Sequence, residues 1–272
     1  MRYTKMHGAG NGFVLIDNSS LQLSVGKLSE IAVRLCAAEK TDGLLAVTPA
    51  EDADFGMLYI NSDGTVGEMC GNGARCIARY GYEHGFSKDP DSISFRATAG
   101  IVTGRRITED TYEVRLNDPS VIDLHRTAPL SGTDWDCSYI ELGDPGIPVA
   151  TVEINTEAFD DLDSLKELGR ALRRHPTFPK GANVTFVSPP DGNHVRAITF
   201  ERGVEDFTLA CGTGSSGAAV TLILRGRIAG DRVELDVPGG RLSVRICRTG
   251  DAISDIYLTG PTAYVSEGEF EL

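Results

Sequence analysis

The stretch Cys70-Gly71-Asn72-Gly73 occurs again as Cys211-Gly212-Thr213-Gly214, 141 residues further along a chain of 272 residues. Each Cys-Gly-x-Gly motif follows an apolar run, a polar turn and a second short strand-like segment, and each precedes a helix-like stretch. The pattern therefore places each cysteine at a predicted strand-to-helix junction. It also indicates that the chain consists of two similar halves.

Further residues keep the same distance from the two cysteines. Asp42 and Asn183 each lie 28 residues before their cysteine and open an apolar run. Asn61 and Arg202 each lie 9 residues before it. Because these pairs occur in the same order, we interpret the halves as two α/β units related by duplication.

The composition is typical of a globular cytoplasmic protein. A chain with 41% apolar residues can bury a core, and its length favours two domains. The N-terminus has no signal-peptide pattern and no run reaches roughly 18 apolar residues, so we expect a cytoplasmic protein without a membrane partner. A net charge of −13 opposes binding to nucleic acid. Six cysteines are expected to be reduced: Cys36, Cys70, Cys76, Cys137, Cys211 and Cys247.

Hydrophobic periodicity predicts an α/β (or α+β) fold with many short strands and four helices. Amphipathic helices are predicted at 27–38 and 162–175. The helices after the cysteines, at 74–84 and 215–225, consist mainly of small or apolar residues, so we expect them to be buried inside sheets. Strands are predicted at 13–16, 44–48, 55–60, 92–97, 112–116, 138–142, 184–187, 197–200, 233–237 and 242–246.

Two polar turns are predicted to separate the domains. The first is Asn117-Asp118-Pro119-Ser120, and the second is Gly260-Pro261. These turns define an N-terminal domain of residues 1–118 plus 262–272 and a C-terminal domain of residues 119–261.

A cysteine directly before a helix suits acid–base chemistry. The unpaired amides and the positive end of the helix dipole favour a thiolate over a thiol. The neighbouring glycines allow the same amides to approach a substrate carboxylate. Two such thiols could remove a proton from one face of a carbon and return one to the other face. The motifs therefore predict racemisation or epimerisation at a carbon next to a carboxylate.

Other interpretations of the motifs exist. Both cysteines could be small buried residues in tight turns. The segment 212–217 also fits the dinucleotide-binding pattern G-x-G-x-x-G, with Asp236 about 20 residues beyond it, so an NAD-dependent oxidoreductase is an alternative. Only 55 residues follow Gly217, which is short for a doubly wound domain. A metal site is not expected, because Cys70 and Cys76 lack zinc-knuckle spacing. A binding protein without catalytic activity is a further alternative.

With these residues in place, the chain resembles the diaminopimelate epimerase family over nearly its whole length. The motifs that carry the resemblance are residues 5–11, 60–64, 70–76, 201–203, 210–214 and 238–240.

The resemblance implies two pseudo-symmetric domains, each a curved, mostly antiparallel sheet around a central helix, with the active site in the cleft between them. It implies an isomerase of lysine and peptidoglycan precursor synthesis that needs neither a cofactor nor a metal. Cys70 and Cys211 would be the two bases that convert LL-diaminopimelate to the meso form. A homodimer is the commonest assembly of such soluble enzymes.

The resemblance also implies the substrate contacts. The α-carboxylate and α-ammonium would be bound by Asn11, Gly71, Asn72, Gly212 and Thr213. The distal amino-acid end would be bound by Asn61, Asn183 and Arg202, where a guanidinium suits a carboxylate. Glu201 matches a family glutamate that tunes the thiols and contacts the ammonium.

Three positions depart from the family pattern. Gly12 replaces an aspartate, Asp144 replaces an asparagine, and Gly146 replaces a histidine. A carboxylate at Asp144 would repel the distal carboxylate of diaminopimelate and attract a cation. An alternative is therefore a pyridoxal-phosphate-independent racemase of the same fold that acts on another amino acid, such as a basic one.

Overall fold

Two helices begin directly after the repeated cysteines. In the computed structural model, which describes residues 1–67, 69–250 and 252–272, helix α3 is Gly71–Glu83 and helix α5 is Gly212–Leu224. Cys70 and Cys211 are the N-cap residues of these helices, both with extended backbone angles. The predicted strand-to-helix junctions are confirmed.

Contacts along the chain define two compact units. Unit 1 consists of Met1–Arg115 and Thr259–Leu272, and unit 2 of Leu116–Leu258. The junctions predicted from the sequence, after residue 118 and after residue 261, lie close to these limits. The division into independently folding domains stays a prediction.

The strands of unit 1 form a ring. The elements besides α3 are β1 (Arg2–Gly8), β2 (Asn11–Asp17), α1 (Asn18–Leu21), α2 (Val25–Glu39), β3 (Gly43–Thr48), β4 (Phe55–Asn61), β5 (Ile93–Ala97), β6 (Gly100–Arg106), β7 (Thr111–Leu116) and the long β16 (Ala252–Glu269). The strand order is β1-β2-β3-β4-β5-β6-β7-β16, and β16 also pairs with β1. The pairs β2–β3 and β4–β5 are parallel because helices α2 and α3 connect them. The pairs β1–β2, β3–β4 and β5–β6 are antiparallel.

Unit 2 repeats the same alternation of parallel and antiparallel strand pairs. Its elements besides α5 are β8 (Pro119–Leu130), β9 (Thr133–Gly143), β10 (Gly146–Glu153), the 3-10 helix η1 (Thr156–Asp160), α4 (Leu162–Arg173), β11 (Asn183–Val187), β12 (His194–Glu201), β13 (Asp206–Thr208), β14 (Arg232–Val237) and β15 (Gly240–Thr249). The pairs β10–β11 and β12–β14 are parallel, and β9–β10, β11–β12 and β14–β15 are antiparallel. The same sequence of pairings in both units confirms the predicted repeat.

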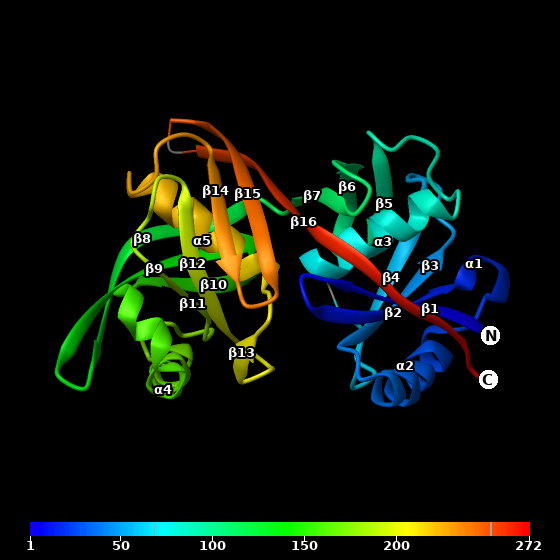
Figure 1. The fold of residues 1–272 in the computed structure, drawn as a ribbon, viewed down its shortest axis with the longest axis horizontal. Helices are drawn as coiled ribbons and strands as arrows, with labels where there is room; N and C mark the ends of the chain where they lie inside the picture. Colours follow the sequence, from blue (N-terminus) through cyan, green and yellow to red (C-terminus); the bar gives the residue numbers. More distant parts are fainter. Residues whose placement is uncertain (68, 251) are drawn as a thin grey trace. The chain divides into compact units, whose positions relative to one another are not determined.

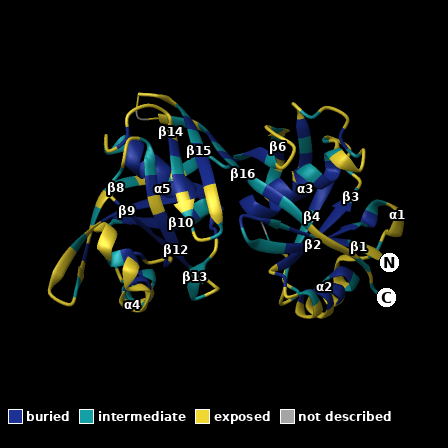
Figure 2. Cartoon of the chain, in the orientation of Figure 1, coloured by how far each residue is buried: buried dark blue, intermediate teal, exposed yellow. Residues whose placement is uncertain are grey.

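Each unit encloses one of the helices that follow the cysteines (Figure 1). Helix α3 packs against β1 to β6, and α5 packs against β9 to β12, β14 and β15. Both are buried along most of their length, whereas α2 and α4 expose one face to solvent, as Figure 2 shows. The fold is therefore mixed α/β and mostly β, with a central helix in each sheet, as predicted.

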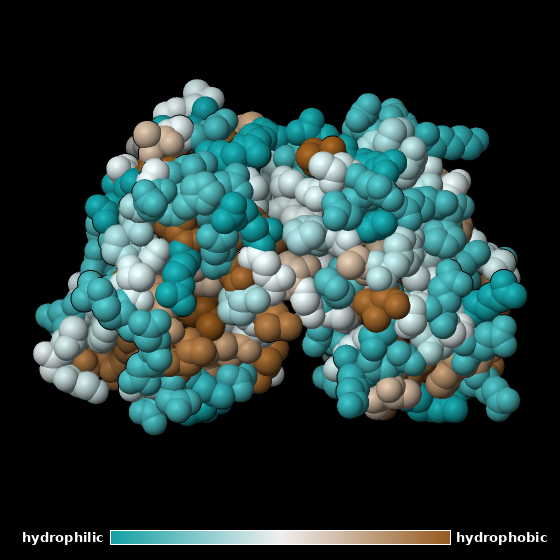
Figure 3. Space-filling view, in the orientation of Figure 1, coloured by the Kyte–Doolittle hydropathy of each residue, from teal (hydrophilic) through white to brown (hydrophobic). Residues whose placement is uncertain are grey.

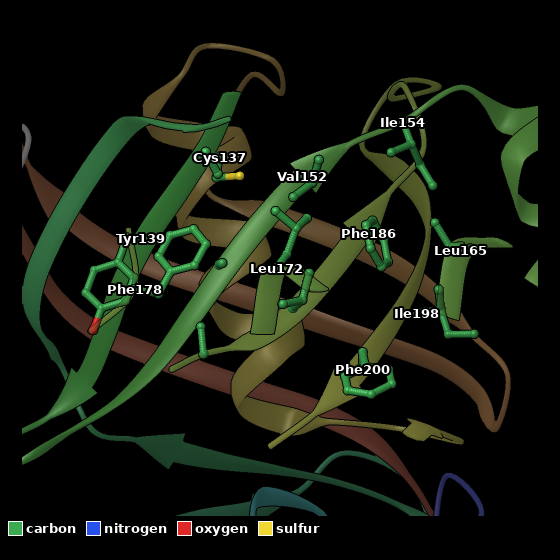
Figure 4. Close-up of a cluster of buried hydrophobic side chains, with 14 of the residues drawn as sticks. Cys137, Tyr139, Val152, Ile154, Leu165, Leu172, Phe178, Phe186, Ile198 and Phe200 are labelled. Atoms are coloured by element: carbon green, nitrogen blue, oxygen red, sulfur yellow. The ribbon is translucent and has the colours of Figure 1, made fainter. Parts of the chain in front are cut away.

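The core of unit 2 fills the space between the sheet and α4. Figure 4 shows Phe186 and Phe200 from the sheet facing Leu165 and Leu172 of α4. These strands thus keep one apolar face against the amphipathic helix α4, and β11 also contacts α5. On the face drawn in Figure 3, hydrophilic side chains cover much of each unit, and hydrophobic side chains gather over part of unit 2.

No helix in the described ranges combines the length and the apolar character needed to cross a membrane.

Several elements differ from the sequence predictions. Helices α3 and α5 each begin three residues earlier than predicted, because the glycines after each cysteine adopt helical conformations. Strands β1, β6, β8, β10, β13 and β16 are not among the strands predicted above. Gly260-Pro261, interpreted from the sequence as a turn, lies inside β16. Pro261 directly precedes the stretch of β16 that pairs with β1, so its missing N–H costs no bond in that ladder.

Candidate active site

Unit 1 places Cys70 beside an asparagine pair. The Cys70 Sγ lies 3.6 Å from the Asn11 Oδ1 atom, to which Asn72 Nδ2 also donates at 3.2 Å. Asn72 belongs to the first turn of α3 and is buried, whereas Asn11 begins β2 and is half-buried. The start of the helix thus holds one thiol and two amide side chains together, all three of which were predicted as site residues.

Asp42 fixes the orientation of Asn11. Its Oδ2 atom accepts hydrogen bonds from Asn11 Nδ2 at 2.5 Å and from the Gly12 backbone N–H at 2.8 Å. The Asn11 amide nitrogen therefore faces Asp42, and its oxygen faces Cys70 and Asn72. The Asp42 backbone carbonyl also accepts from Ser62 N–H at 3.1 Å, which fixes the turn after β4 beside this residue.

Asn61 occupies the start of that turn. Its Nδ2 atom donates to Thr65 Oγ1 at 3.0 Å, and its backbone N–H donates to the Thr65 carbonyl at 2.9 Å. Gly43 pairs with Asn61 in the β3–β4 ladder, directly after Asp42. The predicted distal-end residue therefore lies on the same side of unit 1 as the Asn11–Asp42 pair.

Unit 2 buries its cysteine more deeply. The Cys211 side chain is 6% exposed, and its Sγ atom accepts from the Gly214 N–H at 3.4 Å and lies 3.4 Å from Thr213 Oγ1. Burial, and after it the charge of Glu201, raises the pKa of the Cys211 thiol well above its ordinary value, while the Thr213 and Gly214 bonds oppose the shift. In the free protein Cys211 is therefore a neutral thiol near pH 7.

Asn183 connects the predicted distal-end residues to α5. Its Oδ1 atom accepts from the Arg202 backbone N–H at 2.8 Å, and its Nδ2 atom donates to Thr213 Oγ1 at 3.4 Å. The Arg202 guanidinium donates to the Lys180 carbonyl at 3.1 Å. Glu201 accepts from Thr208 Oγ1 at 3.0 Å. Unit 2 thus brings Asn183 and Arg202 together at the end of α5 that carries the thiol.

Asp144 is a further residue of unit 2 that was predicted for the site. It is exposed in the turn between β9 and β10, and within the described residues it forms no hydrogen bond or ion pair with Cys211, Asn183 or Arg202. The described ranges also contain no group of three or more His, Cys, Asp or Glu residues arranged to hold a metal ion.

Two residues of unit 1 near Cys70 were not predicted from the sequence as site residues. Asp42 was used only to measure the repeat, yet it holds the same position relative to Cys70 as Asn183 holds relative to Cys211. Arg75 lies in α3 with its side chain fully buried, and it donates to Asn72 Oδ1 at 3.0 Å. The shared offset could have identified Asp42, whereas the burial of an arginine has no signal in a single sequence.

Comparisons with known proteins show which family the chain matches. A family model for diaminopimelate epimerase matches residues 3–120 and 145–265. The chain is 34% identical over 279 residues to a diaminopimelate epimerase of Chlorobaculum tepidum, with 98% of this chain and all of the relative covered. It is also 34% identical over 281 residues to a diaminopimelate epimerase of Carboxydothermus hydrogenoformans, with both chains fully covered.

Solved structures show how widely the fold is shared. A phenazine biosynthesis protein of the PhzF family from Bacillus anthracis has a TM-score of 0.76 at 16% identity, over 100% of this chain and 99% of that one. A hydroxyproline epimerase from Agrobacterium vitis has a TM-score of 0.68 at 18% identity, over 98% of this chain and 90% of that one. At these identities the likeness concerns the fold alone.

Proposed function

Because the chain belongs to the diaminopimelate epimerase family, it is an isomerase that epimerises diaminopimelate, and we propose that Cys70 and Cys211 are its two bases. The observation that supports this assignment is the repeated geometry of the thiols. Each cysteine is the N-cap of a buried helix, where backbone amides favour negative charge. No other cysteine of the described residues caps a helix in this way.

The reaction needs one thiolate and one thiol. The thiolate takes the α-hydrogen as a proton, and the electron pair of the broken C–H bond stays on the α-carbon. The other thiol then delivers its proton to the opposite face of that carbon and becomes a thiolate. The amides at the two helix starts would stabilise the negative charge that develops on the adjoining carboxylate. The product is meso-diaminopimelate when the substrate is the LL form.

The remaining predicted residues would bind the two ends of the substrate. We propose that Asn11 and Asn72 bind the reacting amino-acid end, together with Thr213 and the backbone amides of Gly71 and Gly212. Their support is their contact with the thiols or their place in the first helical turns. For the distal end we propose Asn61, Asn183 and Arg202. Glu201 would contact an ammonium, because its effect on Cys211 places its charge near the thiol.

The test is exchange of the α-proton in D₂O. We expect the enzyme to incorporate deuterium at the α-carbon of LL-diaminopimelate, as followed by NMR, without added pyridoxal phosphate or metal. Exchange of lysine, ornithine or histidine but not of diaminopimelate would support the racemase alternative, in which Asp144 binds a cationic side chain. Nicotinamide binding without any exchange would support the oxidoreductase alternative.

We further propose a cytoplasmic enzyme with an amino-acid substrate, on the basis of the family. A homodimer stays a prediction, and size-exclusion chromatography with light scattering would measure it.

A further inference from the structure

Arg75 carries a charge inside unit 1. Its side chain is fully buried, and burial lowers the pKa of its guanidinium to about 10, so the group stays protonated at neutral pH. Among the described residues no carboxylate forms an ion pair with it, and its Nε atom lacks a hydrogen-bond partner. A buried charge without a counter-charge is unfavourable unless hydrogen bonds compensate for the loss of water.

The guanidinium is hydrogen-bonded to the first turn of α3, which directly follows the reactive thiol. Its Nη2 atom donates to Asn72 Oδ1 at 3.0 Å, and its Nη1 atom donates to the Gly71 carbonyl at 3.3 Å. It also interacts electrostatically with Cys70 and Cys76. Burial raises the pKa of Cys76 to about 12, so that thiol stays neutral. Of these two cysteines, Cys70 is therefore the one whose ionisation the charge of Arg75 can change.

The repeat places a neutral residue at the matching position of unit 2. Ser216 follows Cys211 by five residues, as Arg75 follows Cys70, and it is also fully buried. The charge that acts on Cys211 is instead the negative charge of Glu201. Within the described part of the chain, the charge of a buried cation thus acts on Cys70, and the charge of a carboxylate acts on Cys211.

On the basis of the proposed two-cysteine function, we propose that Arg75 is a positioning residue whose buried charge makes Cys70 the thiolate of the resting enzyme, with Cys211 as the thiol. Of the residues that the structure describes, Asn11 and Asp42 act in the opposite direction: Asn11 Oδ1 accepts from the Cys70 thiol, and Asp42 lies behind Asn11. Cys70 is the resting thiolate only where the Arg75 charge outweighs these groups, because the Cys70 side chain accepts no cap hydrogen bond from the α3 amides. In one turnover Cys70 gains the α-proton and Cys211 loses one, so the charge moves from the site with the cation to the site with the carboxylate. The resting state must then be restored by proton exchange with solvent.

The experiment measures the ionisation of Cys70 directly. The full-length protein is alkylated with iodoacetamide from pH 5 to 10, and the rate for each cysteine peptide is obtained by mass spectrometry. In Arg75→Gln, which can still donate to Asn72, we expect the Cys70 rate at pH 7 to fall about tenfold and its profile to move to higher pH. Arg75→Lys should restore most of the rate, and Ser216→Ala should leave the Cys211 profile unchanged.

The outcomes separate this inference from the proposed function. A folded Arg75→Gln or Arg75→Met protein with the wild-type Cys70 profile would overturn the role of Arg75. If neither variant folds, the alkylation profile of Cys70 in the wild type decides. A midpoint pH at or above that of a free thiol, about 8.5, would contradict a resting thiolate at Cys70. A different result is that diaminopimelate shows no exchange of its α-proton while Arg75→Gln still moves the Cys70 alkylation profile to higher pH. That result would overturn the proposed function, and the effect of the Arg75 charge on Cys70 would hold.

Discussion

Individual side chains give the two repeated cysteines unlike surroundings. Glu201 raises the pKa of Cys211 through its charge, in addition to the larger effect of burial. Glu201→Gln removes this charge and should lower that pKa, so Cys211 should react several-fold faster with iodoacetamide at pH 8 while remaining slower than Cys70. The matched control is Glu205→Gln. Glu205 lies in the turn that follows Glu201, but its carboxylate is paired with Arg173 and Arg174. An unchanged Cys211 rate in Glu201→Gln would show that burial alone sets its ionisation.

A buried thiol away from the site should make stability depend on pH. Burial raises the pKa of Cys137 to about 12, whereas the unfolded thiol titrates near its ordinary value. Its contribution to stability is therefore complete below the unfolded pKa and is lost as pH rises toward the folded value. Between pH 8 and pH 10 the wild type should lose about 2 kcal/mol more free energy of unfolding than Cys137→Ala, as measured with urea. Equal losses in the two proteins would mean that Cys137 titrates normally in the folded state.

At the scale of elements, the glycines of α5 fit the helix into its sheet. A Cβ atom added at Gly217 would lie 2.7 Å from Val149 Cγ1 and 2.9 Å from Val149 Cβ on strand β10. Gly217→Ala should therefore destabilise the protein by about 1–3 kcal/mol, although alanine favours helices. The third glycine of the G-x-G-x-x-G pattern is thus explained by helix–sheet packing.

Gly26→Ala in α2 is the control for that substitution. A Cβ atom there meets nothing within 4 Å, so the change should stabilise the protein by about 0.5–1 kcal/mol. Urea unfolding of both variants measures the difference. If Gly217→Ala were as stable as Gly26→Ala, β10 would be able to move away from α5, and the packing explanation would be wrong.

The elements also show what the sequence could reveal. Offsets from two cysteines predicted the repeat and the strand-to-helix junction at each cysteine, because a strand–turn–helix unit has fixed local lengths, although both helices begin three residues earlier than predicted. The long strand β16 was missed, because its polar alternation and Gly260-Pro261 resemble a turn when its partners are unknown. In the same way Asn11, Asp42 and Cys70 are far apart in sequence, and only the β2–β3 ladder brings Asp42 to Asn11. Contacts across a ladder depend on register, which local patterns do not specify.

At the scale of the whole molecule, the proposed chemistry needs a thiol from each unit. Cys70→Ser and Cys211→Ser should each lower kcat/KM for LL-diaminopimelate by roughly two to four orders of magnitude, because a hydroxyl does not replace a thiolate as a base. Cys76→Ser, six residues after Cys70 but buried inside α3, should retain activity if it folds normally by circular dichroism. Near-normal activity in either of the first two variants would contradict the two-base assignment.

Mixing those two variants tests whether one chain supplies both bases. Each variant keeps one intact half-site, so a site built from a single chain stays incomplete in every molecule of the mixture, whatever the oligomeric state. We therefore expect an equimolar mixture, unfolded together and refolded to allow exchange of subunits, to show only the summed residual rates. The wild type carried through the same procedure controls for refolding. A rate far above that sum would mean that Cys70 of one chain and Cys211 of another act on the same substrate, so that a dimer would be required for catalysis.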